Sequence, residues 1–308
     1  MKITDIKAVV GTNSWGSAAY EKMLRGESVG VEVLKLTFDC AKEKNIGVFD
    51  LAQDYGLGKA QKIFGSFGTE DVIISSKFTP VGRYKAGQVR KSFEKDLSEF
   101  HRDYIDIYWL HLPSDIEKNL SEIIELYREK KIRYIGVSNF TLEECQLAKR
   151  ILDEAGIPLY GVQNHYSLLC REWETNGVVD WCKENKITFW AWAVLEEGML
   201  TNPKVKSKKS LMKIYFNRKK KKLRPLYELM EKIGNSHSLG IPQVAMSFCS
   251  SKGIVPVCGC RKPYQVEQLE AAVKTKLTDE EILQLENEAE RLNVKILGAD
   301  IFRFAVRK

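Results

Sequence analysis

Short apolar runs alternate with helical stretches along nearly the whole chain, and this alternation constrains the fold more than any other feature. Runs that are this apolar favour parallel strands buried on both faces, and parallel strands need right-handed helical crossovers. Eight strand–helix units therefore predict a closed (β/α)8 barrel. The runs read KAVVG, IGVFD, DVIISSKF, YIDIYWLH, IRYIGVSNF, LYGVQNH, ITFWAWA and GIVPVCG.

The alternative is an open doubly wound sheet, which requires a glycine fingerprint straight after its first strand. GTNSWG at residues 11–16 lacks the GxGxxG spacing, and GLGKAQ at 56–61 matches it only in part. The chain has 308 residues, enough for one barrel with a C-terminal extension. We favour a single α/β TIM barrel domain over residues 1–308.

Two C-terminal features follow the last apolar run. LTDEEILQLENEAERL (277–292) predicts an extra helix, with Thr278 as N-cap and Glu281 three residues later. The tail GADIFRFAVRK (298–308) is apolar and basic. We expect it to pack back on the barrel.

A basic loop insertion is predicted after the seventh strand, at residues 202–224. Eleven Lys or Arg and no acids lie between Lys204 and Arg224, so this segment supplies the whole net charge of +7. Such a run is typical of a solvated loop, although it also suits contact with a cofactor pyrophosphate or an anionic substrate. A nucleic-acid role is a third interpretation, and the scarcity of aromatic residues for base stacking disfavours it.

The sequence has no uncharged apolar segment of membrane-spanning length and no signal-peptide pattern, so we expect a cytoplasmic protein without membrane contact. Its seven cysteines follow no regular framework, which is typical of reduced thiols. The closest pair, Cys258 and Cys260, has no matching second pair. We therefore predict no metal site.

Four polar residues lie where apolar runs end, and the carboxyl ends of barrel strands are where active sites form. Asp50, Lys77 and His111 each close a run, and Tyr55 follows Asp50 by five residues. A free phenol is too weak an acid to protonate a carbonyl oxygen at neutral pH unless a cation favours the phenolate. Lys77 can supply that charge, Asp50 can hold Lys77, and His111 can donate to the substrate oxygen. Since no side chain donates hydride, carbonyl reduction here implies a nicotinamide cofactor.

At these residues the sequence resembles the aldo-keto reductase superfamily, over essentially the whole chain. Seven motifs occur in the family's order. They are GTNSWG (11–16), FDLAQDYG (49–56), SSKF (75–78), WLHLP (109–113), IGVSNF (135–140), VQNHYSLL (162–169) and WAVLEEGMLT (192–201).

The resemblance implies reversible reduction of a small-molecule aldehyde or ketone, with Tyr55 as general acid. It also implies cofactor contacts along the strand ends, without a metal. Ser138, Asn139 and Gln163 would bind the nicotinamide carboxamide, Trp192 would stack on the ring, and the other contacts would be Gly11, Thr12, Asn13, Leu195, Gly259, Arg261 and Gln265. Trp15 would line the substrate mouth. Without the resemblance, Trp15 and Trp192 are typical core residues, and Asn139 is a candidate helix N-cap.

Departures from the family pattern concern the phosphate contacts. Ala193 and Val194 stand where a serine and a proline are common. After the eighth strand, Gly259 and Cys260 replace a Lys-Ser pair, which leaves Arg261 and Lys262 as local cations. The resemblance favours NADPH, with NADH possible.

A second functional interpretation is a cofactor-binding regulatory module with little turnover, similar to the aldo-keto reductase-like β subunits of potassium channels. The four site residues are compatible with both interpretations. Turnover over a carbonyl panel would distinguish them.

Overall fold

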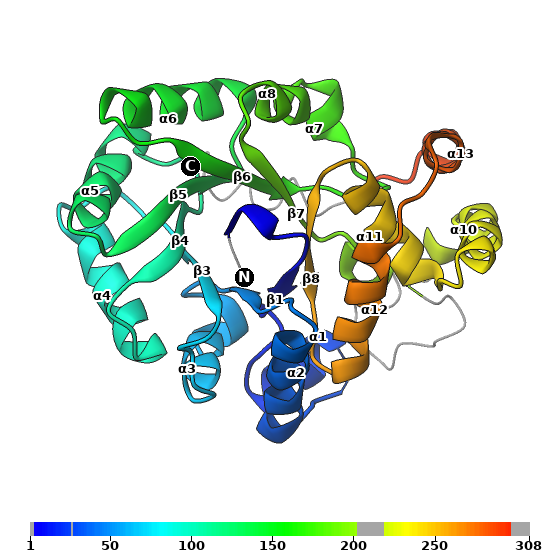
Figure 1. Ribbon diagram of the computed structural model, residues 1–308, viewed down its shortest axis with the longest axis horizontal. Helices are drawn as coiled ribbons and strands as arrows, with labels where there is room; N and C mark the ends of the chain where they lie inside the picture. Colours follow the sequence, from blue (N-terminus) through cyan, green and yellow to red (C-terminus); the bar gives the residue numbers. More distant parts are fainter. Residues whose placement is uncertain (1–2, 26, 202–218, 297–308) are drawn as a thin grey trace.

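The computed structural model describes residues 3–25, 27–201 and 219–296. Its eight parallel strands form a closed barrel in which each strand pairs with the next and β8 pairs with β1 (Figure 1). The strands are β1 (Val9–Gly11), β2 (Val48–Asp50), β3 (Ile73–Phe78), β4 (Ile105–Leu110), β5 (Ile132–Ser138), β6 (Leu159–His165), β7 (Thr188–Trp192) and β8 (Val255–Gly259). The predicted barrel and all eight predicted strands are confirmed.

Helices surround the barrel and cover the outer face of its strands (Figure 1). They are α1 (Ala18–Arg25), α2 (Val31–Glu43), α3 (Ala60–Gly65), α4 (Gln88–Phe100), α5 (Ile116–Arg128), α6 (Leu142–Glu154), α7 (Glu172–Thr175), α8 (Val178–Glu184), α10 (Arg224–Ser236), α11 (Ile241–Ser251), α12 (Pro263–Lys274) and α13 (Asp279–Leu292). The described residues also form the short 3-10 turns η1 (Ile3–Asp5), η2 (Tyr55–Leu57) and η3 (Glu196–Gly198).

The extra C-terminal helix is confirmed as α13. Thr278 is its N-cap and accepts a hydrogen bond from the Glu281 backbone, and the Glu281 side chain accepts one from the Thr278 backbone. This reciprocal capping satisfies two backbone donors that the first turn leaves without helical partners. The predicted packing of the tail 298–308 lies outside the described residues.

The predicted basic loop insertion, 202–224, lies outside the described residues up to 218. Residues 219–222 are helical, and Arg224 begins α10.

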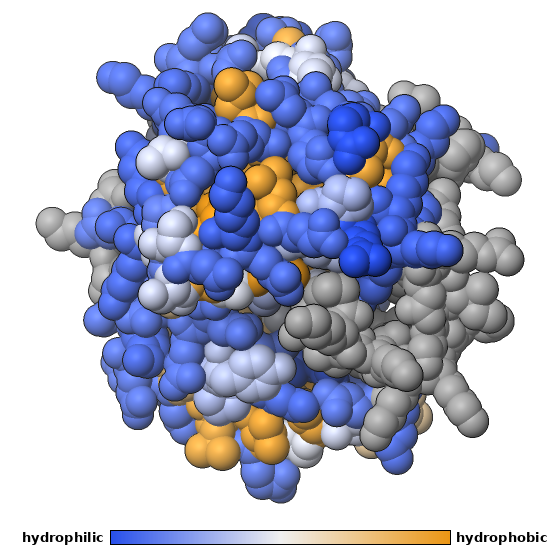
Figure 2. All heavy atoms as spheres, turned by 90° about the vertical axis from the view of Figure 1, so that its right-hand side faces the viewer, coloured by the Kyte–Doolittle hydropathy of each residue, from blue (hydrophilic) through white to orange (hydrophobic). Residues whose placement is uncertain are grey.

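The face that carries α10 and α13 is mostly hydrophilic, with apolar side chains in small separate patches (Figure 2). None of the described helices is both long enough and apolar enough to cross a membrane.

The barrel interior is filled by large aromatic side chains below the strand ends. Trp109 of β4 and Trp190 of β7 are fully buried, with ring centroids 5.0 Å apart. Gly136 of β5 makes room for Trp109, because a Cβ at this position would lie 2.3 Å from the indole. This packing closes the barrel floor, so polar side chains gather above it, at the carboxyl rim.

The strand register brings the first site residues to one level of that rim. Gly11 pairs with Asp50 on one side and with Gly259 on the other, and Asp50 pairs with Ser75. Since side chains alternate along a strand, Lys77 points to the same face as Ser75, two residues before it. The rim therefore collects side chains from distant parts of the sequence.

Candidate active site

A buried lysine links the predicted acid to the predicted carboxylate. Lys77 Nζ lies 2.5 Å from Asp50 Oδ2 and 3.1 Å from the Tyr55 hydroxyl, and it donates to the Leu51 carbonyl at 2.9 Å. The Lys77 side chain is fully buried, and that of Asp50 is 2% exposed. Burial lowers the pKa of Lys77, and the contact with Asp50 opposes that change. The phenol, ammonium and carboxylate thus form one cluster, as the sequence predicts.

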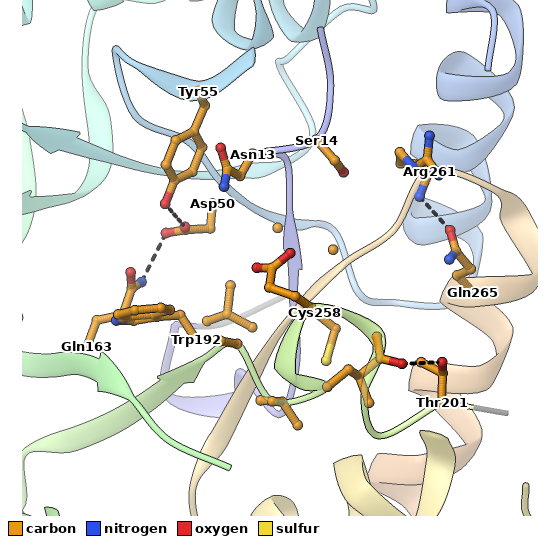
Figure 3. A pocket seen from close by; sticks show the side chains of 18 of the residues that line it. Asn13, Ser14, Asp50, Tyr55, Gln163, Trp192, Thr201, Cys258, Arg261 and Gln265 are labelled. Carbon is orange, nitrogen blue, oxygen red and sulfur yellow. Dashed lines mark hydrogen bonds between the residues drawn. The ribbon is translucent and has the colours of Figure 1, made fainter. Parts of the chain in front are cut away.

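Asp50 uses its two oxygens differently. Oδ2 accepts a hydrogen bond from Lys77 Nζ and another from the Tyr55 hydroxyl, the second at 3.5 Å. Oδ1 accepts from the Ser75 hydroxyl at 2.9 Å and from the Gln163 amide at 3.0 Å (Figure 3). The carboxylate is therefore fixed by donors from three other strands or loops.

His111 joins the cluster from the end of β4. Its ring stands edge-on to that of Tyr55, with the centroids 6.3 Å apart. Burial lowers the pKa of His111 well below its usual value, and the charge of Lys77 lowers it further. The imidazole is therefore neutral near neutral pH. Nδ1 lies 2.8 Å from the Thr79 hydroxyl, so Nε2 is the ring nitrogen left for a ligand.

The glycine after Tyr55 explains the local turn. Gly56 has a φ of 61°, and a Cβ there would lie 1.9 Å from the Trp15 carbonyl oxygen. Its backbone N–H donates to the Asn13 carbonyl at 3.2 Å. Only glycine fits this close approach, which sets the phenol against Lys77.

The cluster opens into a cavity of about 370 Å³ at the carboxyl rim (Figure 3). Its lining runs from Asp50, Tyr55 and His111 to the start of α12. The lining residues are Gly11, Asn13, Ser14, Asp50, Asp54, Tyr55, His111, Asn139, Gln163, Trp192, Ala193, Val194, Leu195, Glu197, Gly198, Thr201, Val257, Cys258, Gly259, Arg261 and Gln265.

Trp192 and Asn139 both line the cavity and contact each other. The indole N–H of Trp192 donates to Asn139 Oδ1 at 3.1 Å, and Asn139 Nδ2 donates to the His111 carbonyl at 3.1 Å. Asn139 is not the N-cap of α6: it has a φ of 63°, and Thr141 caps the helix. The N-cap interpretation of Asn139 is thus wrong, because its side chain turns to the cavity wall.

Behind Trp192 lies a buried ion pair that the sequence interpretation missed. His165 stacks on the indole with ring centroids 4.6 Å apart, and its Nε2 lies 2.9 Å from Glu196 Oε1. Burial disfavours the charged imidazole, but the contacts with Cys170 and Glu196 outweigh burial and raise the pKa of His165 to about 10. His165 is therefore a cation at neutral pH.

The far end of the cavity combines an exposed glycine backbone with a guanidinium. Gly259 is exposed there, and a Cβ on it would project toward Ser14, 3.9 Å from its hydroxyl oxygen. Arg261 lies beside it, and the Gln265 side chain accepts from the Arg261 backbone N–H at 2.7 Å (Figure 3). The bare backbone and the guanidinium fit the adenosine end of a dinucleotide.

Some predicted site residues lie behind the cavity wall. Thr12 and Ser138 are fully buried, and the Thr12 hydroxyl donates to the Asp50 carbonyl. Trp15 is also fully buried, and its indole N–H donates to the Cys260 carbonyl at 2.8 Å. Trp15 thus lies in the core rather than at a substrate mouth, because its ring packs against Phe49.

The sequence interpretation also missed contacts that a simple rule could have found. Ser75 precedes Lys77 by two residues and therefore shares its inward face. Thr79 follows Lys77 by two residues and reaches His111. Asp54, which directly precedes Tyr55, lines the cavity. Among the described residues, no group of three or more His, Cys, Asp or Glu is placed to hold a metal ion.

Comparison with known proteins identifies the family of this chain. The model of the Aldo/keto reductase family matches residues 8–290. The chain is 28% identical to the chloroplastic pyridoxal reductase of Arabidopsis thaliana over 302 residues, which cover 90% of this chain and 81% of the relative. It is 25% identical to the aldo-keto reductase yakc [NADP(+)] of Schizosaccharomyces pombe, over 82% of this chain and 80% of the relative.

A solved structure shows the same fold. The glycerol dehydrogenase of Gluconobacter oxydans superposes with a TM-score of 0.76 at 22% identity, over 95% of this chain and 94% of that one. At this identity the likeness concerns the barrel architecture.

Proposed function

Because the chain belongs to the aldo/keto reductase family, we propose that it reduces an aldehyde or ketone to the alcohol, reversibly, with Tyr55 as the general acid and a nicotinamide cofactor as the hydride donor. The observation that carries this proposal is the contact of Lys77 with both Tyr55 and Asp50 at the cavity wall. The substrate is a small-molecule carbonyl compound, as the names of several relatives indicate for those proteins.

The Tyr55 hydroxyl gives its proton to the carbonyl oxygen of the substrate. The phenolate that remains is stabilised by the Lys77 ammonium, 3.1 Å from the phenol oxygen. Asp50 keeps this ammonium charged, although burial alone would favour the neutral amine. In the reverse direction the same phenolate takes the proton back from the alcohol.

His111 orients the substrate rather than supplying the proton. A neutral imidazole whose Nδ1 faces Thr79 can donate from Nε2 to the carbonyl oxygen. This donor polarises the carbonyl and directs its oxygen toward Tyr55.

A nicotinamide cofactor supplies hydride when it is bound. Asn139 and Gln163 would bind its carboxamide, with Ser138 holding Asn139 from behind, because the Asn139 amide donates to the Ser138 hydroxyl. Trp192 would offer the face of its indole to the ring, and Gly11, Asn13 and Leu195 would border it. Gly259, Arg261 and Gln265 would hold the adenosine end. We propose NADPH as the preferred cofactor, with NADH as the alternative, since one relative is named for NADP(+).

The test replaces Tyr55 by Phe, which keeps the ring and removes the proton. Turnover with a panel of aldehydes and ketones should fall at least about 100-fold, since a positioned general acid contributes that much or more. Cofactor affinity, measured by quenching of tryptophan fluorescence, should change less than about twofold. Equal turnover by the variant would overturn Tyr55 as the acid. Tight cofactor binding by the wild type without turnover on any carbonyl would favour a binding module.

A further inference from the structure

Arg261, which lines the far end of the cavity, and Lys262, the next residue, share one carboxylate of this chain. Glu27 Oε1 lies 2.8 Å from Lys262 Nζ and 3.6 Å from Arg261 Nη2. The Arg261 guanidinium also donates to the Glu27 carbonyl oxygen at 3.4 Å. The Arg261 side chain is 11% exposed and that of Glu27 is 54% exposed, so the guanidinium is mostly buried while the carboxylate reaches solvent.

A buried glutamate fixes the backbone that presents Glu27. Glu21 of α1 is 1% exposed, and its Oε2 accepts from the Ser28 hydroxyl at 2.8 Å and from the Val29 backbone N–H at 2.7 Å. These bonds tie the connection between α1 and α2 to α1 itself. α2 in turn packs against α12, which begins directly after Lys262. Glu27 is therefore held at the start of α12 by its neighbours in the fold.

The backbone donors at this end also have an acceptor within the chain. Gln265 Oε1 accepts from the backbone N–H groups of Arg261 and Lys262, at 2.7 and 3.0 Å. An incoming phosphate must therefore compete for both the cations and the amides. The carboxylate competes more strongly, because it carries a full charge and the amide oxygen carries none.

From this arrangement we infer that Glu27 is a specificity-determining residue that weakens binding of the 2′-phosphate by which NADPH differs from NADH. This inference rests on the proposed function. The carboxylate neutralises Arg261 and Lys262 and repels a second anion at the same cations. A ribose 2′-hydroxyl carries no charge and can donate to the carboxylate, so NADH does not meet this repulsion.

The experiment compares Glu27→Gln, which removes the charge and keeps the side-chain length, with the wild type. The matched control is Glu129→Gln, which breaks a surface ion pair with Arg90, 2.5 Å long, on the other side of the barrel from α12 (Figure 1). Dissociation constants for NADPH and NADH are measured by tryptophan fluorescence. Those for 2′,5′-ADP and ADP, which probe the adenosine end alone, are measured by calorimetry.

In Glu27→Gln, NADPH and 2′,5′-ADP should bind about three- to tenfold more tightly, the range expected for a partly exposed charge. NADH and ADP should change less than about twofold, and Glu129→Gln should change none of the four. Weaker NADPH binding would overturn the inference, because Glu27 would then be positioning the cations for the phosphate. Equal effects on both cofactors, or none, would also overturn it. If the wild type binds neither cofactor, the proposed function itself is wrong.

Discussion

Asp50 determines whether Lys77 can act as a cation beside Tyr55. Its Oδ2 contacts the ammonium, while Ser75 and Gln163 hold Oδ1. A fully buried ammonium is costly without a counter-charge, and here burial already lowers the pKa of Lys77. Under the proposed mechanism, the charge that stabilises a Tyr55 phenolate therefore depends on Asp50, a residue that never transfers the proton.

Asp50→Asn should lower both turnover and stability. Without the carboxylate, Lys77 becomes neutral at a lower pH, so the alkaline limit of the pH–rate profile should move to lower pH. The free energy of unfolding should fall by about 3 kcal/mol, the usual result of breaking a buried ion pair. Ser75→Ala, which removes one donor to the opposite oxygen, should leave the alkaline limit nearly in place. An unchanged pH profile in Asp50→Asn would contradict this role.

The buried carboxyl of Asp96, which does not line the cavity, should make the stability of the protein depend on pH. Burial raises its pKa to about 7, although hydrogen bonds from Gln61 and Ser76 oppose the change. Because the folded-state pKa exceeds the unfolded value, the folded protein binds the extra proton. This contribution to stability is complete below the unfolded pKa and is lost as pH rises to about 7.

Asp96→Asn should remove this dependence. Relative to the variant, the wild type should lose stability as pH rises from about 4 to about 7, by roughly 1.4 kcal/mol per unit of pKa shift. Urea unfolding at several pH values measures the difference. A stability difference that is flat over this range would contradict a neutral Asp96 in the folded protein.

A series of contacts between strands runs from β5 through β4 and β3 to Asp50 at the end of β2. Gly136 of β5 admits the Trp109 ring, and the Trp109 indole N–H donates to the Ser75 hydroxyl at 2.8 Å. Ser75 in turn donates to Asp50. The packing of the barrel floor therefore supports the orientation of the Asp50 carboxylate.

Gly136→Ala should disturb both packing and catalysis. Its Cβ would lie 2.3 Å from the indole, so Trp109 must shift. The expected loss is about 1–3 kcal/mol of unfolding free energy, as for other overpacked cores, with reduced turnover. Gly47→Ala is the control, because its Cβ would meet only Val72 at an ordinary 3.7 Å. If the two variants behave alike, Gly136 is not the residue that admits Trp109.

For the helices and strands, the sequence predicts positions along the chain more reliably than it predicts the directions of side chains. Apolar runs mark all eight strands because parallel strands are buried on both faces, and the Thr278 capping box marks the start of α13. The same runs indicate the candidate site, because Asp50 and Lys77 each close a run and Tyr55 follows Asp50 by five residues. Trp15 was misplaced because a loop aromatic can turn inward or outward, and only its bond to Cys260, 245 residues away, decides this.

Across the whole molecule, closure of the barrel makes one site from distant segments. Gln163 reaches Asp50 over a separation of 113 residues. The His165–Glu196 pair in turn links β6 to the turn after β7, directly behind Trp192. The buried charges of His165 and Glu196 therefore support Trp192 in the cavity wall and also join β6 to the turn after β7.

His165 should make the stability of the whole protein sensitive to alkaline pH. Its folded-state pKa of about 10 exceeds the ordinary value of 6.5, so its contribution is complete below about pH 6.5 and is lost as pH rises to about 10. His165→Gln can still donate to Glu196 but carries no charge. The wild type should therefore be more stable than the variant by a few kcal/mol near neutral pH, and the difference should vanish above about pH 10. Thermal unfolding across this range, with tryptophan fluorescence as a second signal, measures it. A difference that persists unchanged above pH 10 would show that His165 contributes packing rather than charge.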